Sequence, residues 1–221
     1  MTTIIDTDTA VVDTGAWFLT LDSMAITEVN GEDSKRFLQG QLSCNLLKLS
    51  EGNTLRGVLC NLKGRVIADV RVLSGDNAVL LISRSDLQEK ILTTLNKYRV
   101  FFKTSLRATG TQYCVYGIGG VNLAATVNAL GISLPDIADS CVRVQGITLI
   151  SMPMSSLYAL PRFLLVFERS SEQSQALWQT LRSLLESVPE SMWTMADIRT
   201  GQAHPDLSQS EVFTPAAELR H

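Results

Sequence analysis

The sequence is poor in the residues that build common metal and nucleophilic sites. Its 221 residues include two histidines, His204 and His221, and four cysteines, no two of which have C-x-x-C spacing. Structural zinc needs clustered cysteine and histidine ligands, and histidine-based catalysis needs a base beside its nucleophile. We therefore expect no metal site, and we interpret the scattered cysteines as buried, reduced thiols.

The usual signatures of nucleotide and hydrolase sites are also absent. The sequence has no G-x-G-x-x-G after a predicted strand, no Walker A loop, no G-x-S-x-G elbow and no H-E-x-x-H. One short run, GIGG at 117–120, follows a predicted strand and precedes a predicted helix. That pattern is compatible with phosphate binding at a helix N-terminus, but a tight turn into the helix is the interpretation that we favour.

Charge and hydropathy indicate an ordinary globular chain. The net charge is −3, and hydrophobic residues make up 45% of the sequence. This balance argues against a broad RNA-binding face and leaves only a local basic patch open. No apolar run reaches the roughly 18 residues of a membrane span, and the polar leader at 1–16 lacks the basic and apolar parts of a signal peptide. We expect a cytoplasmic protein with no membrane contact.

The hydrophobic periodicity predicts an α+β fold. Alternating or short apolar runs predict strands, and apolar residues at helical spacing predict helices. The strands are expected at 17–19, 24–26, 55–60, 65–73, 78–83, 102–107, 113–118, 142–150 and 163–168, and the helices after residues 33, 85, 122 and 170 and at 191–199. Because strands and helices do not alternate strictly, two sheet-plus-helix units fit better than a doubly wound sheet. No linker divides residues 17–221, which we treat as one domain with a subdivision near residue 110.

The stretch LCNLKGRVIAD at 59–69 predicts a β-hairpin. Two apolar runs flank a polar break that contains Gly64, a residue that permits a tight turn. Lys63 and Arg65 flank this glycine and form either a solvated basic tip or a contact for a polyanion.

Several motifs, in order, resemble the YgfZ-like proteins of the glycine-cleavage T-protein superfamily. GEDSKRFLQGQLS at 31–43 resembles the family pattern G-x-D-(A/S)-x-x-F-L-Q-G-Q-(L/V)-(T/S), and LCNLKGRVIAD is similar to its (L/H)-C-(D/N)-x-K-G-(R/K) hairpin. KYRVFFK at 97–103, W-x-x-x-x-I-x-x-G at 193–201 and FTP at 213–215 are similar to further family segments. The resemblance implies a tetrahydrofolate-binding α+β fold of two intertwined units and, for this branch, a role in iron–sulfur protein maintenance and tRNA modification.

The sequence departs from the family at its end. The signature Lys-Gly-Cys-Tyr-x-Gly-Gln-Glu should follow FTP, and family members usually carry a C-terminal β-barrel as well. Here the chain continues as AAELRH and stops. It is therefore either a fragment or a shortened paralogue, without the barrel, that has lost the cysteine-dependent part of the function.

The resemblance also implies which residues contact folate. Trp193 is the main candidate, with Met24 at an early-strand position where relatives often carry tryptophan. Asp69 lies where the T-protein carries paired aspartates that serve folate N5 chemistry, and here the pair reads Ala68-Asp69. Lys63 and Arg65 would meet the glutamate tail, a phosphate or RNA. Each role has a purely structural alternative. Trp193 could be core packing, Asp69 could lie on a solvated strand face or cap a turn, and Lys63 and Arg65 could form a solvated loop tip.

Three functions follow from these features. The first is a folate-binding factor that supports iron–sulfur proteins or tRNA modification without turnover, and therefore has no catalytic residue. The second is a folate-dependent aminomethyl or one-carbon transferase, against which the loss of one aspartate argues. The third is an interaction scaffold that has lost its ligand. The first implies a reduced folate as ligand and iron–sulfur proteins as partners, with RNA contact as a lesser expectation.

Overall fold

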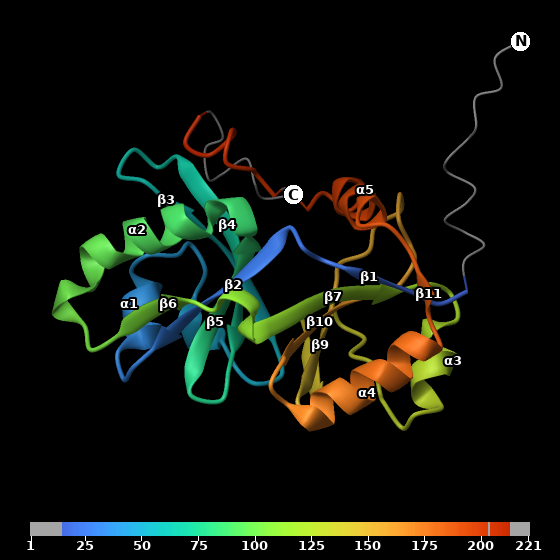
Figure 1. Ribbon diagram of the computed structural model, residues 1–221. Helices are drawn as coiled ribbons and strands as arrows, with labels where there is room; N and C mark the ends of the chain where they lie inside the picture. The colour runs from blue at the N-terminus through green and yellow to red at the C-terminus, as the bar shows by residue number, and fades with distance from the viewer. Residues whose placement is uncertain (1–14, 203, 213–221) are drawn as a thin grey trace, which may run out of the picture. The chain divides into compact units, whose positions relative to one another are not determined.

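The chain divides into two compact units, each assembled from three separate stretches of sequence. The computed structural model describes residues 15–202 and 204–212 (Figure 1). Of the described residues, unit 1 comprises those up to Leu21, Cys114–Ala138 and Val142–Thr200, and unit 2 comprises Asp22–Tyr113, Asp139–Cys141 and those from Gly201 to Val212. The backbone passes repeatedly between the units, so they are intertwined. The expectation of one domain over 17–221, with a subdivision near 110, stays a prediction.

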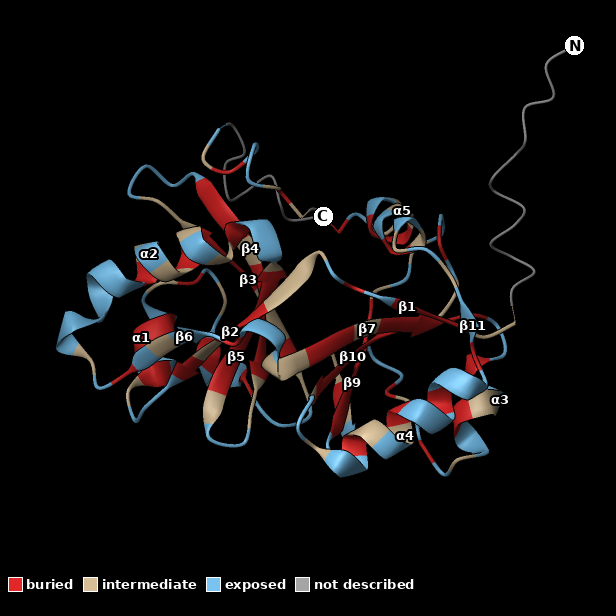
Figure 2. Cartoon of the chain, in the orientation of Figure 1, coloured by how far each residue is buried: buried red, intermediate tan, exposed pale blue. Residues whose placement is uncertain are grey.

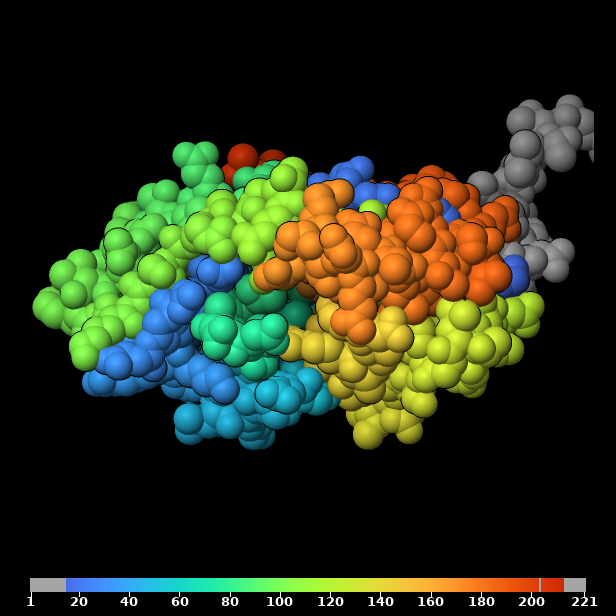
Figure 3. Space-filling model, turned by 60° about the horizontal axis from the view of Figure 1, so that its bottom comes forward, coloured from blue at the N-terminus to red at the C-terminus, as the bar shows by residue number. Residues whose placement is uncertain are grey.

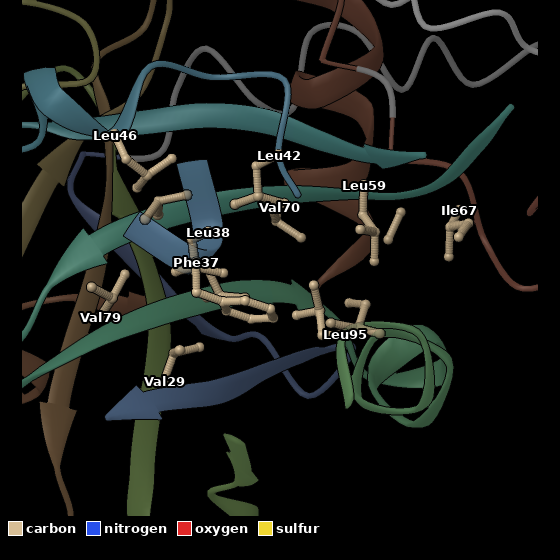
Figure 4. Packing of buried hydrophobic residues seen from close by; sticks show 14 of the residues in the cluster. Val29, Phe37, Leu38, Leu42, Leu46, Leu59, Ile67, Val70, Val79 and Leu95 are labelled. Carbon is tan, nitrogen blue, oxygen red and sulfur yellow. The ribbon is translucent and has the colours of Figure 1, made fainter. Parts of the chain in front are cut away.

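Unit 2 is built on a five-stranded sheet. Its strands have the order β3-β4-β5-β2-β6, and its helices α1 (Ser34–Gln39) and α2 (Gln88–Tyr98) are amphipathic. The strands are β2 (Met24–Asn30), β3 (Thr54–Cys60), β4 (Val66–Ser74), β5 (Ala78–Arg84) and β6 (Ser105–Ala108). Figure 4 shows Phe37 and Leu38 of α1 and Leu95 of α2 packed against strand residues that include Val70. This buried layer fixes the register of β3 and β4, because a slip of one residue would move their apolar side chains out of the core.

Unit 1 is built on a six-stranded sheet with the order β11-β1-β7-β10-β9-β8. Its core is aromatic: Trp178 stacks on Tyr116 with ring centroids 4.1 Å apart, and meets Phe18 edge to face at 5.5 Å. The strands are β1 (Trp17–Thr20), β7 (Tyr113–Gly119), β8 (Cys141–Val144), β9 (Ile147–Ser151), β10 (Arg162–Glu168) and β11 (Glu186–Ser187), and the helices are α3 (Leu123–Asn128), α4 (Glu172–Ser183) and α5 (Ser191–Arg199). In Figure 2 the strands are largely buried, and α4 shows a buried and an exposed side.

The structure confirms the α+β class and the two sheet-plus-helix units. Two strand predictions need correction. The expected strand 142–150 is a hairpin of β8 and β9, because Gln145 and Gly146 both take positive φ, 48° and 80°, and reverse the chain. The expected strand 102–107 begins only at Ser105, because Phe102 closes a 3₁₀ turn and packs on Phe37 with ring centroids 5.3 Å apart.

Candidate ligand-binding hairpin and its pocket

The predicted hairpin at 59–69 is confirmed as the connection between β3 and β4. Its tip is organised by Asn61, whose Oδ1 accepts hydrogen bonds from the backbone N–H of Lys63 at 2.9 Å and of Arg65 at 3.0 Å. Gly64 donates its N–H to the Asn61 carbonyl at 2.9 Å and has φ +75°, a conformation that favours glycine. The tip therefore holds a defined shape, with the exposed side chains of Lys63 and Arg65 on either side of the glycine.

The C-terminal part of the described chain, at Glu211 and Val212, is hydrogen-bonded to this tip. Arg65 Nη1 donates to the carbonyls of Glu211 and Val212, each at 3.2 Å, and Asn61 Nδ2 donates to Glu211 Oε2 at 2.9 Å. Lys90 of α2 pairs with the other carboxylate oxygen of Glu211 at 2.9 Å. The hydrogen bonds from Asn61 and Lys90 lower the pKa of Glu211 below its ordinary value. Glu211 is therefore ionised at neutral pH, with its charge offset by Lys90.

A pocket of about 410 Å³ opens between the hairpin tip and α2, a volume within the usual range for small-molecule sites. Three of the residues that line it are cationic, Lys63, Arg65 and Lys97, and Glu211 is the acidic residue among them. Within the described part of the chain, neither the Lys63 nor the Lys97 ammonium has a hydrogen-bond or ion-pair partner. The other residues lining the pocket are Cys60, Asn61, Leu62, Ile67, Thr94 and Tyr98. A pocket with this charge favours an anionic ligand.

Asp69 forms a second polar cluster on the same hairpin. Its side chain is 9% exposed, and its Oδ2 accepts from His204 Nδ1 at 3.0 Å and from Arg56 Nη2 at 3.4 Å. Burial alone would raise the pKa of Asp69, but the hydrogen bond from His204 and the charges of His204, Arg56 and Arg71 outweigh burial, so the pKa lies below its ordinary value. Asp69 is thus a buried carboxylate that stays ionised at neutral pH.

Arg71 anchors the far side of this cluster. It lies directly opposite Arg56 across the β3–β4 ladder, an arrangement that like charges disfavour. Arg71 Nη1 instead binds Asp139 Oδ1 and donates to Thr54 Oγ1 at 2.7 Å. Since Asp139 offsets Arg71 and Asp69 offsets Arg56, the opposed arginines are tolerated and alternate with two carboxylates.

Trp193 and Met24 occupy different surroundings. Trp193 lies on α5 of unit 1 and is 2% exposed. The Arg162 guanidinium stands 4.7 Å from the centroid of its ring, and Gly117 packs so closely that a Cβ there would lie 2.6 Å from the ring. Met24 begins β2 and is half-buried. The folate-contact roles of both stay predictions.

Of the five residues named from sequence, the structure brings Lys63 and Arg65 together in one pocket, which includes neither Asp69 nor Met24. Sequence reasoning missed His204 as the partner of Asp69, since no local pattern links residues so far apart in the chain. Lys97 and Tyr98 carried a signal, because they open the KYRVFFK segment that resembles the family. The predicted FTP segment at 213–215 lies outside the described residues.

The cysteines need a partial correction. Cys114 and Cys141 are buried as expected, but Cys44 and Cys60 are only half-buried, because Cys60 lines the pocket and Cys44 faces Gly57 at the surface of the sheet. Burial raises the pKa of both half-buried thiols, so they are weak nucleophiles. In residues 15–202 and 204–212, no three histidine, cysteine or acidic side chains form a group able to hold a metal. Among the described helices, none has the length and hydropathy needed to cross a bilayer.

The folding pattern of unit 1 and unit 2 is that of an aminomethyltransferase. The crystal structure of glycine cleavage system aminomethyltransferase T from Bartonella henselae superposes with a TM-score of 0.65 over 81% of this chain and 49% of that one. Its sequence identity of 16% limits the likeness to the fold.

The sequence relatives are more specific. The tRNA-modifying protein YgfZ of Klebsiella pneumoniae is 28% identical over 199 residues, which is 90% of this chain and 59% of the relative. The protein of the same name from Pectobacterium carotovorum is also 28% identical, with 90% and 58% coverage. No family model matches the chain. The resemblance to YgfZ-like proteins is thereby confirmed, and the chain spans about 59% of the length of its Klebsiella relative.

Proposed function

We propose that this chain binds a reduced folate and supports tRNA modification or the maintenance of iron–sulfur proteins, without turning over a substrate itself. The relatives are named as tRNA-modifying proteins, and the fold resembles that of a glycine cleavage system aminomethyltransferase T. The folate ligand is the part of the proposal that the family motifs imply. The proposal includes a cytoplasmic location, because the relatives' name points to tRNA as the substrate and tRNA is found there. The chain spans about 59% of its Klebsiella relative, so the tRNA-modifying role of the longer protein is only proposed for this chain.

The observation that carries this proposal is the buried, ionised carboxylate of Asp69. The contacts that Arg56 and His204 make to it both use Oδ2, so among the described residues Oδ1 is the oxygen that remains as an acceptor for a ligand N–H. Tetrahydrofolate is rich in N–H donors on its pterin ring, and when bound it supplies the amine that carries one-carbon groups. A charge-assisted hydrogen bond from such a donor to a carboxylate is short and strong.

The cationic pocket at the hairpin tip suits the other end of the same molecule. Folate ends in a glutamate tail with carboxylates, and Lys63, Arg65 and Lys97 place three positive charges around one opening. Arg65 is oriented by its bonds to two backbone carbonyls, so its guanidinium is held in place before a ligand arrives. The family resemblance adds Trp193 of unit 1 and Met24 of unit 2 to the proposal, each as a surface for the flat ring.

The test is calorimetric titration of the chain with tetrahydrofolate under reducing conditions. We expect saturable heat that Asp69→Asn weakens at least about tenfold, since the replacement loses a charge-assisted hydrogen bond. Lys63→Ala should weaken the binding of polyglutamylated folate more than that of the monoglutamate. Asp76→Asn, in the exposed turn between β4 and β5, is the matched control and should leave affinity unchanged.

Two results would contradict the proposal. Absence of heat with every reduced folate, from a chain whose circular dichroism shows it folded, would favour the scaffold. Formation of methylene-tetrahydrofolate from an aminomethyl donor would favour a transferase.

The role of Trp193 needs its own variant because the ring is buried. Trp193→Phe keeps an aromatic ring in the core, whereas truncation to alanine would remove its packing against Gly117 and Arg162. If Trp193 contacts the pterin, tetrahydrofolate quenches the emission of the parent chain, and the variant loses that part of the quench and binds more weakly. Equal affinity in parent and variant would remove Trp193 from the site.

A further inference from the structure

The segment that connects α2 to β6 carries cations and exposed apolar rings in alternation. Its sequence is KYRVFFK at 97–103, and Tyr98, Val100 and Phe101 are 40%, 76% and 92% exposed. In Figure 3 this green stretch stands at the surface at the left edge of the view. A single exposed apolar residue is ordinary, but these three lie within one helical end and the 3₁₀ turn that follows it, Arg99–Phe101.

The contacts of the residues on either side of Phe101 explain why its side chain is exposed. Arg99 bonds to residues on both sides of the turn: its Nε donates to the side-chain Oδ1 of Asn96 at 2.6 Å, and its Nη1 donates to the backbone carbonyl of Thr104 at 3.2 Å. The next residue, Phe102, is anchored against Phe37 of the core. Because Phe102 packs inward and Arg99 is hydrogen-bonded on both sides of the turn, the side chain of Phe101 is directed toward solvent.

The turn is continuous with the cationic pocket. Lys97 and Tyr98 line that pocket together with Lys63 and Arg65 of the hairpin tip. Phe101 follows Tyr98 by three residues, so their Cα atoms lie at most about 11 Å apart along the chain. We call the set Lys63, Arg65, Lys97, Tyr98, Arg99 and Phe101 the tip surface.

We propose that the tip surface binds single-stranded or loop RNA, with bases stacked on Phe101 and Tyr98 and phosphates against its cations. This inference rests on the proposed function, because it assigns a contact surface for the RNA that the relatives' name points to. Aromatic rings interleaved with lysine and arginine suit unpaired nucleotides, whose bases stack and whose backbone is anionic. A folate confined to the pocket would make no contact with Phe101, whereas an extended RNA strand would cover both the pocket and Phe101.

The test is fluorescence anisotropy of a labelled single-stranded oligoribonucleotide and of a tRNA anticodon stem-loop, titrated with the full chain at two salt concentrations. Phe101→Ala should weaken binding about tenfold, within the range measured for loss of one stacked base. Lys97→Gln should weaken it less, and should reduce the slope of log affinity against log salt by roughly 0.7, as expected for one phosphate contact on a single strand.

Matched controls lie elsewhere in unit 2. Leu47 is 86% exposed and Lys48 follows it. Lys48→Gln repeats the change made at Lys97, and Leu47→Ala truncates an exposed apolar side chain outside the tip surface, so both should leave RNA affinity unchanged. Because Phe101 is exposed, its truncation should not unfold the chain. The inference would be overturned if Phe101→Ala bound RNA as tightly as the parent chain. It would also be overturned if this variant lost binding to anionic vesicles while keeping its binding to RNA.

The outcome separates this inference from the proposed function. Phe101→Ala leaves Asp69 and the pocket cations in place, so its tetrahydrofolate titration should match the parent. Folate binding without RNA binding in the parent chain would refute the tip surface alone. RNA binding that depends on Phe101, in a chain that gives no heat with folate, would support the surface and refute folate binding.

Discussion

Replacement of Asp69 by asparagine tests whether its carboxylate is charged inside the folded protein. The change keeps the shape of the side chain and removes the charge that His204 and Arg56 face. Hydrogen bonds to charged groups contribute about 1.5–3 kcal/mol to stability. Here one contact is of ordinary length, 3.0 Å, and the other is long, 3.4 Å. We therefore expect Asp69→Asn to lower the free energy of unfolding of unit 2 by about 2 kcal/mol at pH 7.

The loss should depend on pH in a defined direction. The pKa of Asp69 is lowered in the folded state, so its carboxylate stabilises the fold above the unfolded pKa of about 3.9. That contribution disappears as pH falls through the folded pKa, because both states then bind the proton. The difference between parent and variant should be present at pH 7 and should shrink as the pH falls toward 3. The groups facing Asp69 are His204, Arg56 and Arg71, and the two arginines keep their charge throughout.

The assay must report on unit 2, which contains none of the three tryptophans: Trp17, Trp178 and Trp193 all belong to unit 1. Hydrogen exchange of β4 amides, followed by mass spectrometry of peptides, meets this need. At pH 7, a loss of about 2 kcal/mol corresponds to roughly 30-fold faster exchange of the most protected amides. Urea unfolding monitored by far-ultraviolet circular dichroism extends the comparison to acid pH. Unchanged protection in Asp69→Asn at pH 7, or a difference that persists undiminished at pH 3, would refute the ionised carboxylate.

Further substitutions test the hairpin, the aromatic core and the orientation of β4. Gly64→Ala should cost about 1 kcal/mol in urea unfolding, because φ is +75° while a Cβ would meet open space, so backbone strain is the whole cost. Trp178→Ala should cost about 3–5 kcal/mol and abolish much of the near-ultraviolet circular dichroism, since its ring stacks on Tyr116; Trp178→Phe should cost distinctly less. Ala68→Asp should lower stability by about 3–5 kcal/mol in urea, because it places an unpaired charge in the core, whereas Ala68→Ser should be milder.

The fold was largely predictable because its signals are local. Apolar runs bounded by turn residues marked β3, β4 and β5, and the helix expected at 191–199 has the same bounds as α5. The hairpin of β8 and β9 was hidden, because its reversal uses Gln145 in a positive-φ conformation and not a recognised turn pair. The strand predicted at 102–107 began too early, because Phe102 follows the 3₁₀ turn Arg99–Phe101 and packs inward on Phe37.

The candidate site was predictable only where its residues are close in sequence. Lys63, Gly64 and Arg65 follow one another, so their common placement could be inferred from the hairpin pattern. The hydrogen bonds from His204 to Asp69 and from Asn61 to Glu211 join distant parts of the chain, and they depend on the path that the chain takes after α5. The low pKa of Asp69 depends on those distant partners as well, so no local motif predicts it.

The geometry of β4 also changes how its Ala68-Asp69 dipeptide is understood. Successive side chains on a strand point to opposite faces of the sheet. Ala68 is fully buried in the cluster that contains Phe37 and Leu95, whereas Asp69 faces His204 and Arg56. A second carboxylate at position 68 would therefore point into the apolar core and would not stand beside Asp69. Restoring an adjacent aspartate pair in this register cannot produce a two-carboxylate site, so any acid–base chemistry at the hairpin would have to draw its second group from elsewhere. In the described structure, the titratable side chain beside Asp69 is His204, whose Nδ1 lies 3.0 Å from the carboxylate and which comes from a segment near the far end of the chain.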